Sequence, residues 1–147
     1  MSQLKFILLI DDSDADNHYH KIVIGRTKVE CAVKSINSSL DALEYLKKAI
    51  SHDDALIFPL PQLIMMDINM PALNGFELLD KLRQVPDRYD RKKDIRICML
   101  SGSLNPDDRA IALERYADLV FGFYLKPLNE KTINEIINRY FPENAIM

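Results

Sequence analysis

Four short runs of apolar residues divide the chain, and each run ends in polar residues. The runs cover residues 6–10, 63–66, 95–100 and 119–125, and they end at Asp11-Asp12-Ser13, Asp67, Ser101-Gly102 and Lys126-Pro127, respectively. A short, continuous apolar run is typical of a strand that is covered on both faces, as in a parallel sheet. A weaker strand is predicted at residues 30–35, where Cys31 and Val33 alternate with Lys34, as expected at a sheet edge.

Segments with a helical repeat of apolar residues lie between the predicted strands. Four of them are predicted to begin at the capping residues Ser39, Asn74, Asn105 and Asn129. Pro106, at the first position of the third of these helices, fits this assignment. A less regular segment, residues 14–25, is predicted to be a helix that closes at Gly25. Two connections are long, residues 51–61 and 85–94, and the charged second one is interpreted as a solvated surface turn.

Five strands that alternate with five helices predict an α/β fold, a doubly wound parallel sheet with helices on both faces. The expected strand order is 2-1-3-4-5, as in flavodoxin-like proteins. The chain has 147 residues, and its 48% hydrophobic content can supply one full core. A single domain is therefore expected, and two folded domains are nearly excluded.

The charge balance and the cysteines exclude several classes of function. With 19 basic and 22 acidic residues, the net charge is −3, which offers no basic field for nucleic acid or for an anionic membrane surface. Cys31 and Cys98 lie far apart without neighbouring metal ligands, and we expect both to be buried apolar residues. His18, His20 and His52 are expected at the surface. No run approaches the ~18 apolar residues of a membrane span, and none resembles a signal-peptide core, so a cytoplasmic protein is expected.

Acidic residues follow two strands whose ends are expected to be neighbours. In a sheet of this order, ligands bind at the carboxyl ends of strands 1 and 3, where the strand order reverses. Asp11 and Asp12 follow the first strand and Asp67 follows the third, while adjacent strands lie only ~4.8 Å apart. Three carboxylates so close would repel one another unless a cation lies among them. Oxygen ligands of this kind favour Mg²⁺, which is usually held by one or two carboxylates and a phosphate oxygen.

The ends of the fourth and fifth strands supply groups that suit a phosphate. Ser101 offers a hydroxyl, and Lys126 offers a positive charge. Asp67 would then be the nucleophile, because a carboxylate can attack a phosphoryl group while the metal and Lys126 stabilise the developing charge. The pattern therefore favours formation of an acyl phosphate.

Together these residues resemble the receiver domain of two-component response regulators, over essentially the whole chain. The matching motifs are Asp11-Asp12, Asp67-Ile68-Asn69-Met70-Pro71 with Asn74-Gly75, Ser101-Gly102 and Lys126-Pro127. Each motif alone is weak, but five pieces in this order, each at the end of the appropriate strand, are specific. The resemblance implies the (βα)5 receiver fold.

The resemblance also implies how the acidic residues act. Asp67 would accept a phosphoryl group from a sensor histidine kinase or a phosphotransfer protein. Asp12 and Asp67 would bind Mg²⁺ directly, Asp11 mainly through water, and Asn69 through its backbone carbonyl. The only chemistry of the chain would be this phosphotransfer and the later dephosphorylation at Asp67.

Further residues are implied to read out the phosphoryl group. Ser101 and Lys126 would bind it, and Phe123 matches an aromatic position that turns inward upon activation. That position is often Tyr in the family, so a switch at Phe123 would act through ring packing alone. A cis peptide bond before Pro127 and a structural role for Gly75 are also expected.

The length of the chain indicates how it would signal. We expect residues 1–147 to form one receiver domain, with a core of about 4–141 and no effector domain. Output would then be contact with a downstream protein, which the sequence does not name, or service as a phosphate relay. The surface from about 105 to 139 is the usual output or homodimer surface of the family.

Other interpretations differ at particular residues. A phosphatase of the haloacid dehalogenase type also uses an aspartate nucleophile with Mg²⁺, but it needs a second Asp where this chain has Asn69. A flavodoxin-like FMN carrier would place phosphate beside Asp11 and Asp12, which would repel it, and a P-loop nucleotidase is excluded because GxxxxGK[ST] is absent from the sequence. A receiver-shaped scaffold that is never phosphorylated would have lost an acid or the lysine.

Overall fold

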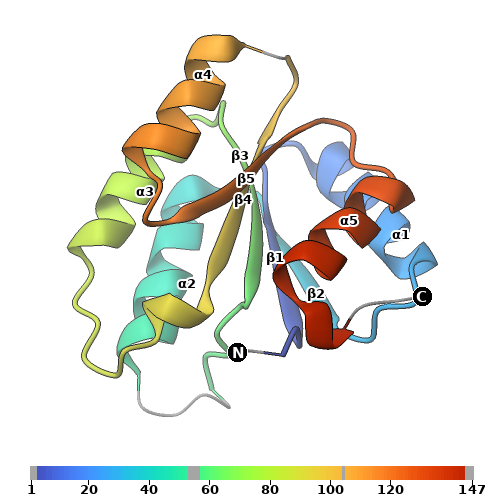
Figure 1. Ribbon diagram of the computed structural model, residues 1–147. Coiled ribbons are helices and arrows are strands. Elements are labelled where there is room, and N and C mark those ends of the chain that lie inside the picture. The colour runs from blue at the N-terminus through green and yellow to red at the C-terminus, as the bar shows by residue number, and fades with distance from the viewer. Residues whose placement is uncertain (1–2, 53–56, 104, 145–147) are drawn as a thin grey trace.

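The computed structural model describes residues 3–52, 57–103 and 105–144 (Figure 1). The strands are β1 (Phe6–Ile10), β2 (Ala32–Ile36), β3 (Leu63–Asp67), β4 (Arg96–Ser101) and β5 (Val120–Leu125). The α-helices are α1 (Asp14–Arg26), α2 (Ser39–Ser51), α3 (Gly75–Gln84), α4 (Pro106–Ala110) and α5 (Glu130–Tyr140). Two short 3-10 helices, η1 (Lys92–Asp94) and η3 (Pro142–Asn144), and a π-helical turn, η2 (Ile111–Arg115), also occur.

The five strands form one parallel sheet in the predicted order β2-β1-β3-β4-β5. Figure 1 shows the sheet between two layers of helices, with α2, α3 and α4 on one face and α1 and α5 on the other. All residues of β1 and β3 are buried, because these central strands are covered on both faces. β2 lies at the edge of the sheet, and none of its residues is fully buried. The predicted doubly wound, flavodoxin-like fold is therefore confirmed.

The core consists of two apolar layers, one on each face of the sheet. Successive side chains of a strand point to opposite faces. Phe6, Leu8 and Ile10 of β1 therefore pack in the layer under α2, α3 and α4, whereas Ile7 and Leu9 pack in the layer under α1 and α5. Because β1 is packed on both faces, its position in the sheet is fixed, and so is the position of Asp11, which follows it.

The two cysteines differ in burial. Cys98 is buried as predicted, and burial raises its pKa to about 12. Cys31 is only partly buried, because it lies at the edge beside β2, and burial raises its pKa to about 11. Both are free thiols, and both are protonated at neutral pH, so neither is an activated nucleophile.

Most helices begin at the predicted caps. The side chains of Asn74, Asn105 and Asn129 accept backbone N–H groups at the starts of α3, α4 and α5. The cap of α2, however, is Ser38 rather than Ser39. Ser39 is the first helical residue, and its side chain is buried. The prediction was one residue late because two adjacent serines offer the same capping group.

Two helices end differently from the expectation. α1 does not close at Gly25 but continues to Arg26, where the backbone N–H and the hydroxyl of Thr27 both donate to the Ile24 carbonyl. α4 begins at Pro106 as predicted, but after five residues it gives way to the π-helical turn η2. Within the described residues, no helix is long and apolar enough to cross a membrane.

The connection between α3 and β4 is docked rather than simply solvated. The guanidinium group of Arg91 donates to the carbonyls of Ala49 and His52 at the end of α2. The carboxylate of Asp87 accepts the backbone N–H groups of Arg91 and Lys92 at 2.7 and 3.1 Å. The interpretation as a solvated turn therefore holds only in part: Arg88, Asp90 and Lys93 are exposed, whereas the partly buried Arg91 binds the end of α2. Of the other long connection, residues 53–56 lie outside the described part of the chain.

Candidate functional site

The acidic residues predicted from the sequence meet at the carboxyl ends of β1 and β3. These strands are neighbours, with Ile10 opposite Met66, so the next residues, Asp11 and Asp67, lie side by side. Carboxylate oxygens of Asp11, Asp12 and Asp67 lie within 4.8 Å of one another. Asp11 and Asp67 are buried, whereas Asp12 is exposed to solvent. We call these three residues the acidic cluster.

The first turn of α1 holds Asp11 in place. The Asp11 carboxylate accepts the backbone N–H of Ser13 at 2.9 Å, and its backbone carbonyl accepts the side-chain amide of Asn17 at 2.8 Å. Ser13 in turn caps α1 by accepting the backbone N–H of Asp16 at 3.1 Å. The start of this helix therefore determines how the Asp11 carboxylate is directed.

Lys126 reaches the acidic cluster from the end of β5. The peptide bond between Lys126 and Pro127 is cis, as the resemblance implies. The Lys126 Nζ lies 3.0 Å from Asp11 Oδ2 and 3.3 Å from Asp67 Oδ1. It also lies 2.9 Å from Asp16 Oδ2, a contact that the sequence did not predict. One ammonium group is thus shared by three carboxylates.

Burial and crowding disfavour the ionised form of Asp67. Burial raises the pKa of Asp67, the charge of Asp11 raises it further, and Lys126 only partly opposes both. Burial also opposes the charge of Lys126, but its hydrogen bonds to Asp16 and Asp11 and the charge of Asp67 raise its pKa above the usual value. Lys126 therefore stays protonated, yet it does not fully compensate the carboxylates.

The acidic cluster fits a divalent cation. Its donors are carboxylate oxygens, the hard ligands that Mg²⁺ and similar ions prefer. Burial and the charge of Asp11 raise the pKa of Asp67, and a bound cation would favour its ionised form. Because Asp12 is exposed, an ion can reach the cluster from solvent. The backbone carbonyl of Asn69, the fourth expected ligand, belongs to the turn after β3, and its part in metal binding stays a prediction.

Ser101 lies at the neighbouring strand end. β4 pairs with β3, and Leu100 stands opposite Asp67, so Ser101 at the end of β4 is adjacent to the acidic cluster. Its buried hydroxyl donates to the carbonyl of Ser103 at 2.6 Å and accepts the backbone N–H of Ser103 at 3.2 Å. The hydroxyl is thus satisfied by its own turn in this structure.

Phe123 lies inside the fold rather than on its surface. It belongs to the apolar layer under α4 and is only 6% exposed. The ring also borders a groove lined by Asn105, Pro106 and Arg109 at the start of α4. In this structure the aromatic ring therefore occupies an inward position, and its action as a switch stays a prediction.

Gly75 allows α3 to approach the end of β3. Its N–H donates to the Ile68 carbonyl at 2.7 Å. A Cβ atom at this position would lie 2.8 Å from the Asp67 carbonyl oxygen and 2.6 Å from Met99 Cε. Contacts this short are essentially never observed, so a side chain would force the start of α3 and the end of β3 apart. The contact supports the structural role expected of Gly75.

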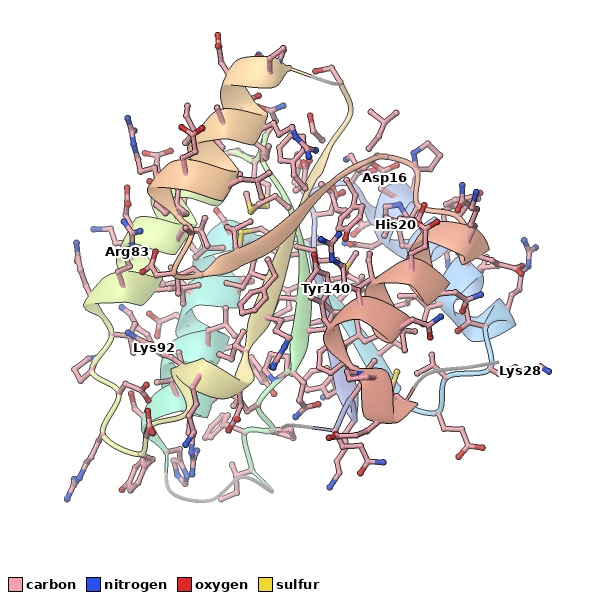
Figure 2. All side chains as sticks on the ribbon, in the orientation of Figure 1. Asp16, His20, Lys28, Arg83, Lys92 and Tyr140 are labelled. Atoms are coloured by element: carbon pink, nitrogen blue, oxygen red, sulfur yellow. The ribbon has the colours of Figure 1, made fainter. Side chains whose placement is uncertain are left out.

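Two residues of α1 belong to the site although sequence reasoning missed them. Asp16 contacts Lys126, and His20, which was expected at the surface, is buried. The Nε2 atom of His20 accepts the backbone N–H of Leu128 at 3.2 Å, and burial lowers the pKa of the imidazole. Figure 2 shows Asp16 above His20 on the same helix. Their four-residue spacing was a signal for a shared helix face, but the apolar pattern did not show that this face points inward.

Comparisons with protein sequences agree with this geometry. The family described as the response regulator receiver domain matches residues 7–138. Response regulator Rcp1 of Synechocystis sp. is 29% identical over 114 residues, which make up 78% of this chain and 73% of Rcp1. The nitrate/nitrite response regulator protein NarL of Escherichia coli is 35% identical over 79 residues, 54% of this chain. The matched part is only 32% of NarL, so this chain spans about a third of that relative.

Solved structures extend the likeness to three dimensions. A two component response regulator from Cytophaga hutchinsonii matches with a TM-score of 0.78 and 31% identity, covering 94% of this chain and 97% of that one. The Mn²⁺-bound form of response regulator Rcp1 matches with a TM-score of 0.67 and 27% identity, covering 97% and 98% of the two chains. A divalent metal ion is thus bound by a relative of the same fold. The chain belongs to the response regulator receiver domain family of two-component signalling.

Proposed function

We propose that Asp67 accepts a phosphoryl group in a Mg²⁺-dependent reaction and that phosphorylation controls contact with another protein. The observation that carries this proposal is the position of Lys126, whose Nζ lies 3.0 Å from Asp11 and 3.3 Å from Asp67. A carboxylate beside a fixed cation suits attack on a phosphoryl group, because the cation offsets charge on the phosphoryl oxygens. The match to the receiver domain family supports the same assignment.

In the proposed step, an oxygen of Asp67 attacks the phosphorus of a phosphohistidine on a histidine kinase or phosphotransfer protein. The new O–P bond forms as the P–N bond breaks, and the departing histidine nitrogen keeps the electron pair and takes up a proton. Lys126 pairs with a phosphoryl oxygen and stabilises its charge. When held by Asp11, Asp12, Asp67 and the Asn69 carbonyl, Mg²⁺ supplies further charge neutralisation at the phosphoryl oxygens. The phosphoryl group later leaves Asp67 by hydrolysis.

Residues at the strand ends next to the acidic cluster then transmit the phosphorylation of Asp67 to the surface of the protein. We propose that the Ser101 hydroxyl leaves its own turn and donates to the phosphoryl group, and that repacking of Phe123 conveys the change to α4. Output then occurs in the cytoplasm, by contact of this receiver domain with another protein. A homodimer through the surface from 105 to 139 is part of this proposal. It is supported by two apolar residues of β5, Phe121 and Leu125, which are 42% and 45% exposed.

No observation favours the other two interpretations. A phosphatase of the haloacid dehalogenase type would need an acid-base carboxylate two residues after the nucleophile, where this chain has Asn69. A scaffold that is never phosphorylated does not need the contacts that join Asp11, Asp67 and Lys126. These contacts are the reason to prefer the phosphorylated receiver.

Intact mass spectrometry after incubation with acetyl phosphate and Mg²⁺ tests the proposal. Attack by Asp67 would release acetate and leave one phosphoryl adduct per chain. The adduct should be lost in the Asp67→Asn variant and in the presence of EDTA, but kept in Asp107→Asn, a control at an exposed acid of α4. Phosphate release without a lasting adduct would favour a phosphatase. A folded wild-type protein without any adduct, also after addition of a phosphorylated histidine kinase, would refute the proposal.

A further inference from the structure

Lys126 is surrounded by three carboxylates at the site, and it donates hydrogen bonds to two of them, Asp11 and Asp16. A lysine ammonium group has three N–H donors. The three nearest carboxylate oxygens are those of Asp16 at 2.9 Å, Asp11 at 3.0 Å and Asp67 at 3.3 Å. A phosphoryl oxygen on Asp67 that pairs with Lys126 must therefore compete with Asp11 and Asp16 for the ammonium group.

The three carboxylates differ in how easily water can replace the lysine. The side chains of Asp11 and Asp67 are 2% and 6% exposed, whereas that of Asp16 is 45% exposed. A buried carboxylate that loses its cation is left without solvent, which is costly. A half-exposed carboxylate is hydrated instead, so its ion pair breaks at little cost. Asp16 is therefore the partner that Lys126 gives up most readily.

The two segments that carry Asp16 and Lys126 are fixed by hydrogen bonds near these residues. One helical turn after Asp16, the buried His20 accepts the backbone N–H of Leu128, two residues after Lys126. Asp16 itself lies in the first turn of α1, capped by Ser13. This bond joins α1 to the loop after β5 and so keeps the backbone of Asp16 close to that of Lys126.

We propose that Asp16 is a positioning residue that restrains Lys126 in the unphosphorylated protein and releases it to the phosphoryl group on Asp67. The proposal rests on the phosphorylation of Asp67 proposed above. An interaction that exists only before phosphorylation opposes phosphorylation, since it stabilises one of the two states alone. Loss of Asp16 should therefore raise the ratio of phosphorylated to free protein, by about two- to fivefold for a partly exposed ion pair.

Asp14 provides a matched control for this effect. Like Asp16, it is an acidic residue in the first turn of α1, so its removal changes the net charge and the interaction with the helix dipole in the same way. Its carboxylate accepts the side-chain amide of Asn37 at 2.9 Å instead of contacting Lys126. A difference between Asp16→Asn and Asp14→Asn therefore reports the contact with Lys126 and not the general loss of charge.

The test uses the full chain with saturating Mg²⁺ and limiting acetyl phosphate, and it measures the adduct at steady state and its lifetime after the donor is removed. Asp16→Asn should raise the ratio of phosphorylated to free protein about two- to fivefold over Asp14→Asn. Asp16→Glu, which restores a carboxylate, should return the ratio toward the wild-type value. If the role of Asp16 were purely structural, Asp16→Asn would lower the adduct level, and Asp16→Glu would not restore the wild-type ratio.

The possible outcomes separate this inference from the proposed function. If the wild type forms an adduct on Asp67 but Asp16→Asn behaves like Asp14→Asn, the restraint on Lys126 does not exist. If Asp16→Asn lowers the ratio, Asp16 places Lys126 for the reaction, and the inference is overturned in sign. If the wild type itself forms no adduct, the proposed function has failed, and the restraint fails with it.

Discussion

Comparison of Gly75→Ala with Gly25→Ala tests whether glycine is needed at residue 75 for α3 to approach the site. The Gly25→Ala variant measures the general effect of replacing a glycine in a helix. A Cβ atom at residue 75 would lie 2.8 Å from the Asp67 carbonyl oxygen and 3.0 Å from Ile68 Cα, both backbone atoms that cannot turn aside. Gly25, in the last turns of α1, has no heavy atom within 4 Å of the same hypothetical Cβ. The two substitutions therefore add the same methyl group to a helix, once against backbone and once into open space.

The expected changes have opposite signs. At Gly25, alanine should raise the free energy of unfolding by about 0.5–1 kcal/mol, because alanine favours the helix. At Gly75, overpacking should lower it by about 1–3 kcal/mol. In a chain of this size each kcal/mol corresponds to roughly 2–4 °C in Tm. Because the strained contact is to the Asp67 backbone, the Gly75→Ala variant should also form its phosphoryl adduct more slowly.

Urea unfolding followed by far-UV circular dichroism measures the difference, since the chain has no Trp to report unfolding by fluorescence. The m-values of the two variants should match that of the wild type, so that the midpoints report stability alone. Equal stability of Gly75→Ala and Gly25→Ala would refute the argument that only glycine lets α3 reach β3. Reduced stability of Gly75→Ala without slower phosphorylation would refute the link to Asp67.

Two further predictions concern the turn chemistry and the pH dependence of stability. Burial lowers the pKa of His20 in the folded protein, so the unfolded chain binds a proton first as the pH falls, and stability is lost as the pH drops below about 6.5. His20→Gln, whose side-chain carbonyl can accept the Leu128 N–H, should flatten this loss between pH 7 and pH 5 in urea titrations, with His18→Gln at an exposed position as the control. Ala72 has a φ of 66°, a conformation that costs a residue with a side chain about 1–2 kcal/mol, so Ala72→Gly should raise the midpoint of urea unfolding. Asp90→Gly, at a φ of 53°, should raise it less, because aspartate tolerates this region better.

The sheet could be predicted from the sequence because its central strands are buried on both faces. β1 and β3 are therefore continuous apolar runs, and their ends are marked by Asp11 and Asp67. The edge strand β2 gives a weaker pattern, and its predicted bounds were off by one or two residues. The burial of a strand thus determines how clearly its sequence shows its limits.

α1 shows where the same reasoning fails. Its buried residues include the polar Asn17 and His20 together with Val23 and Ile24. A helix whose inward face is half polar has no clear apolar stripe, so the sequence did not indicate which side chains point into the protein. The polar residues on this face make hydrogen bonds to backbone groups around the site, which the apolar pattern cannot reveal.

The position of the site follows from topology, whereas its contacts follow from α1. In a doubly wound sheet the carboxyl ends of the strands meet at one edge, so Lys126 converges with Asp11 although 115 positions separate them in the chain. Which carboxylates share the lysine depends on the rotation of α1, because a shift of one residue along a helix turns a side chain by about 100°. Such a shift would move Asp16 and His20 away from the site, whereas Asp11 and Asp67 would still follow the ends of their strands. The proposed phosphoryl chemistry therefore depends on the fold, and the proposed restraint on Lys126 depends on the particular sequence of this helix.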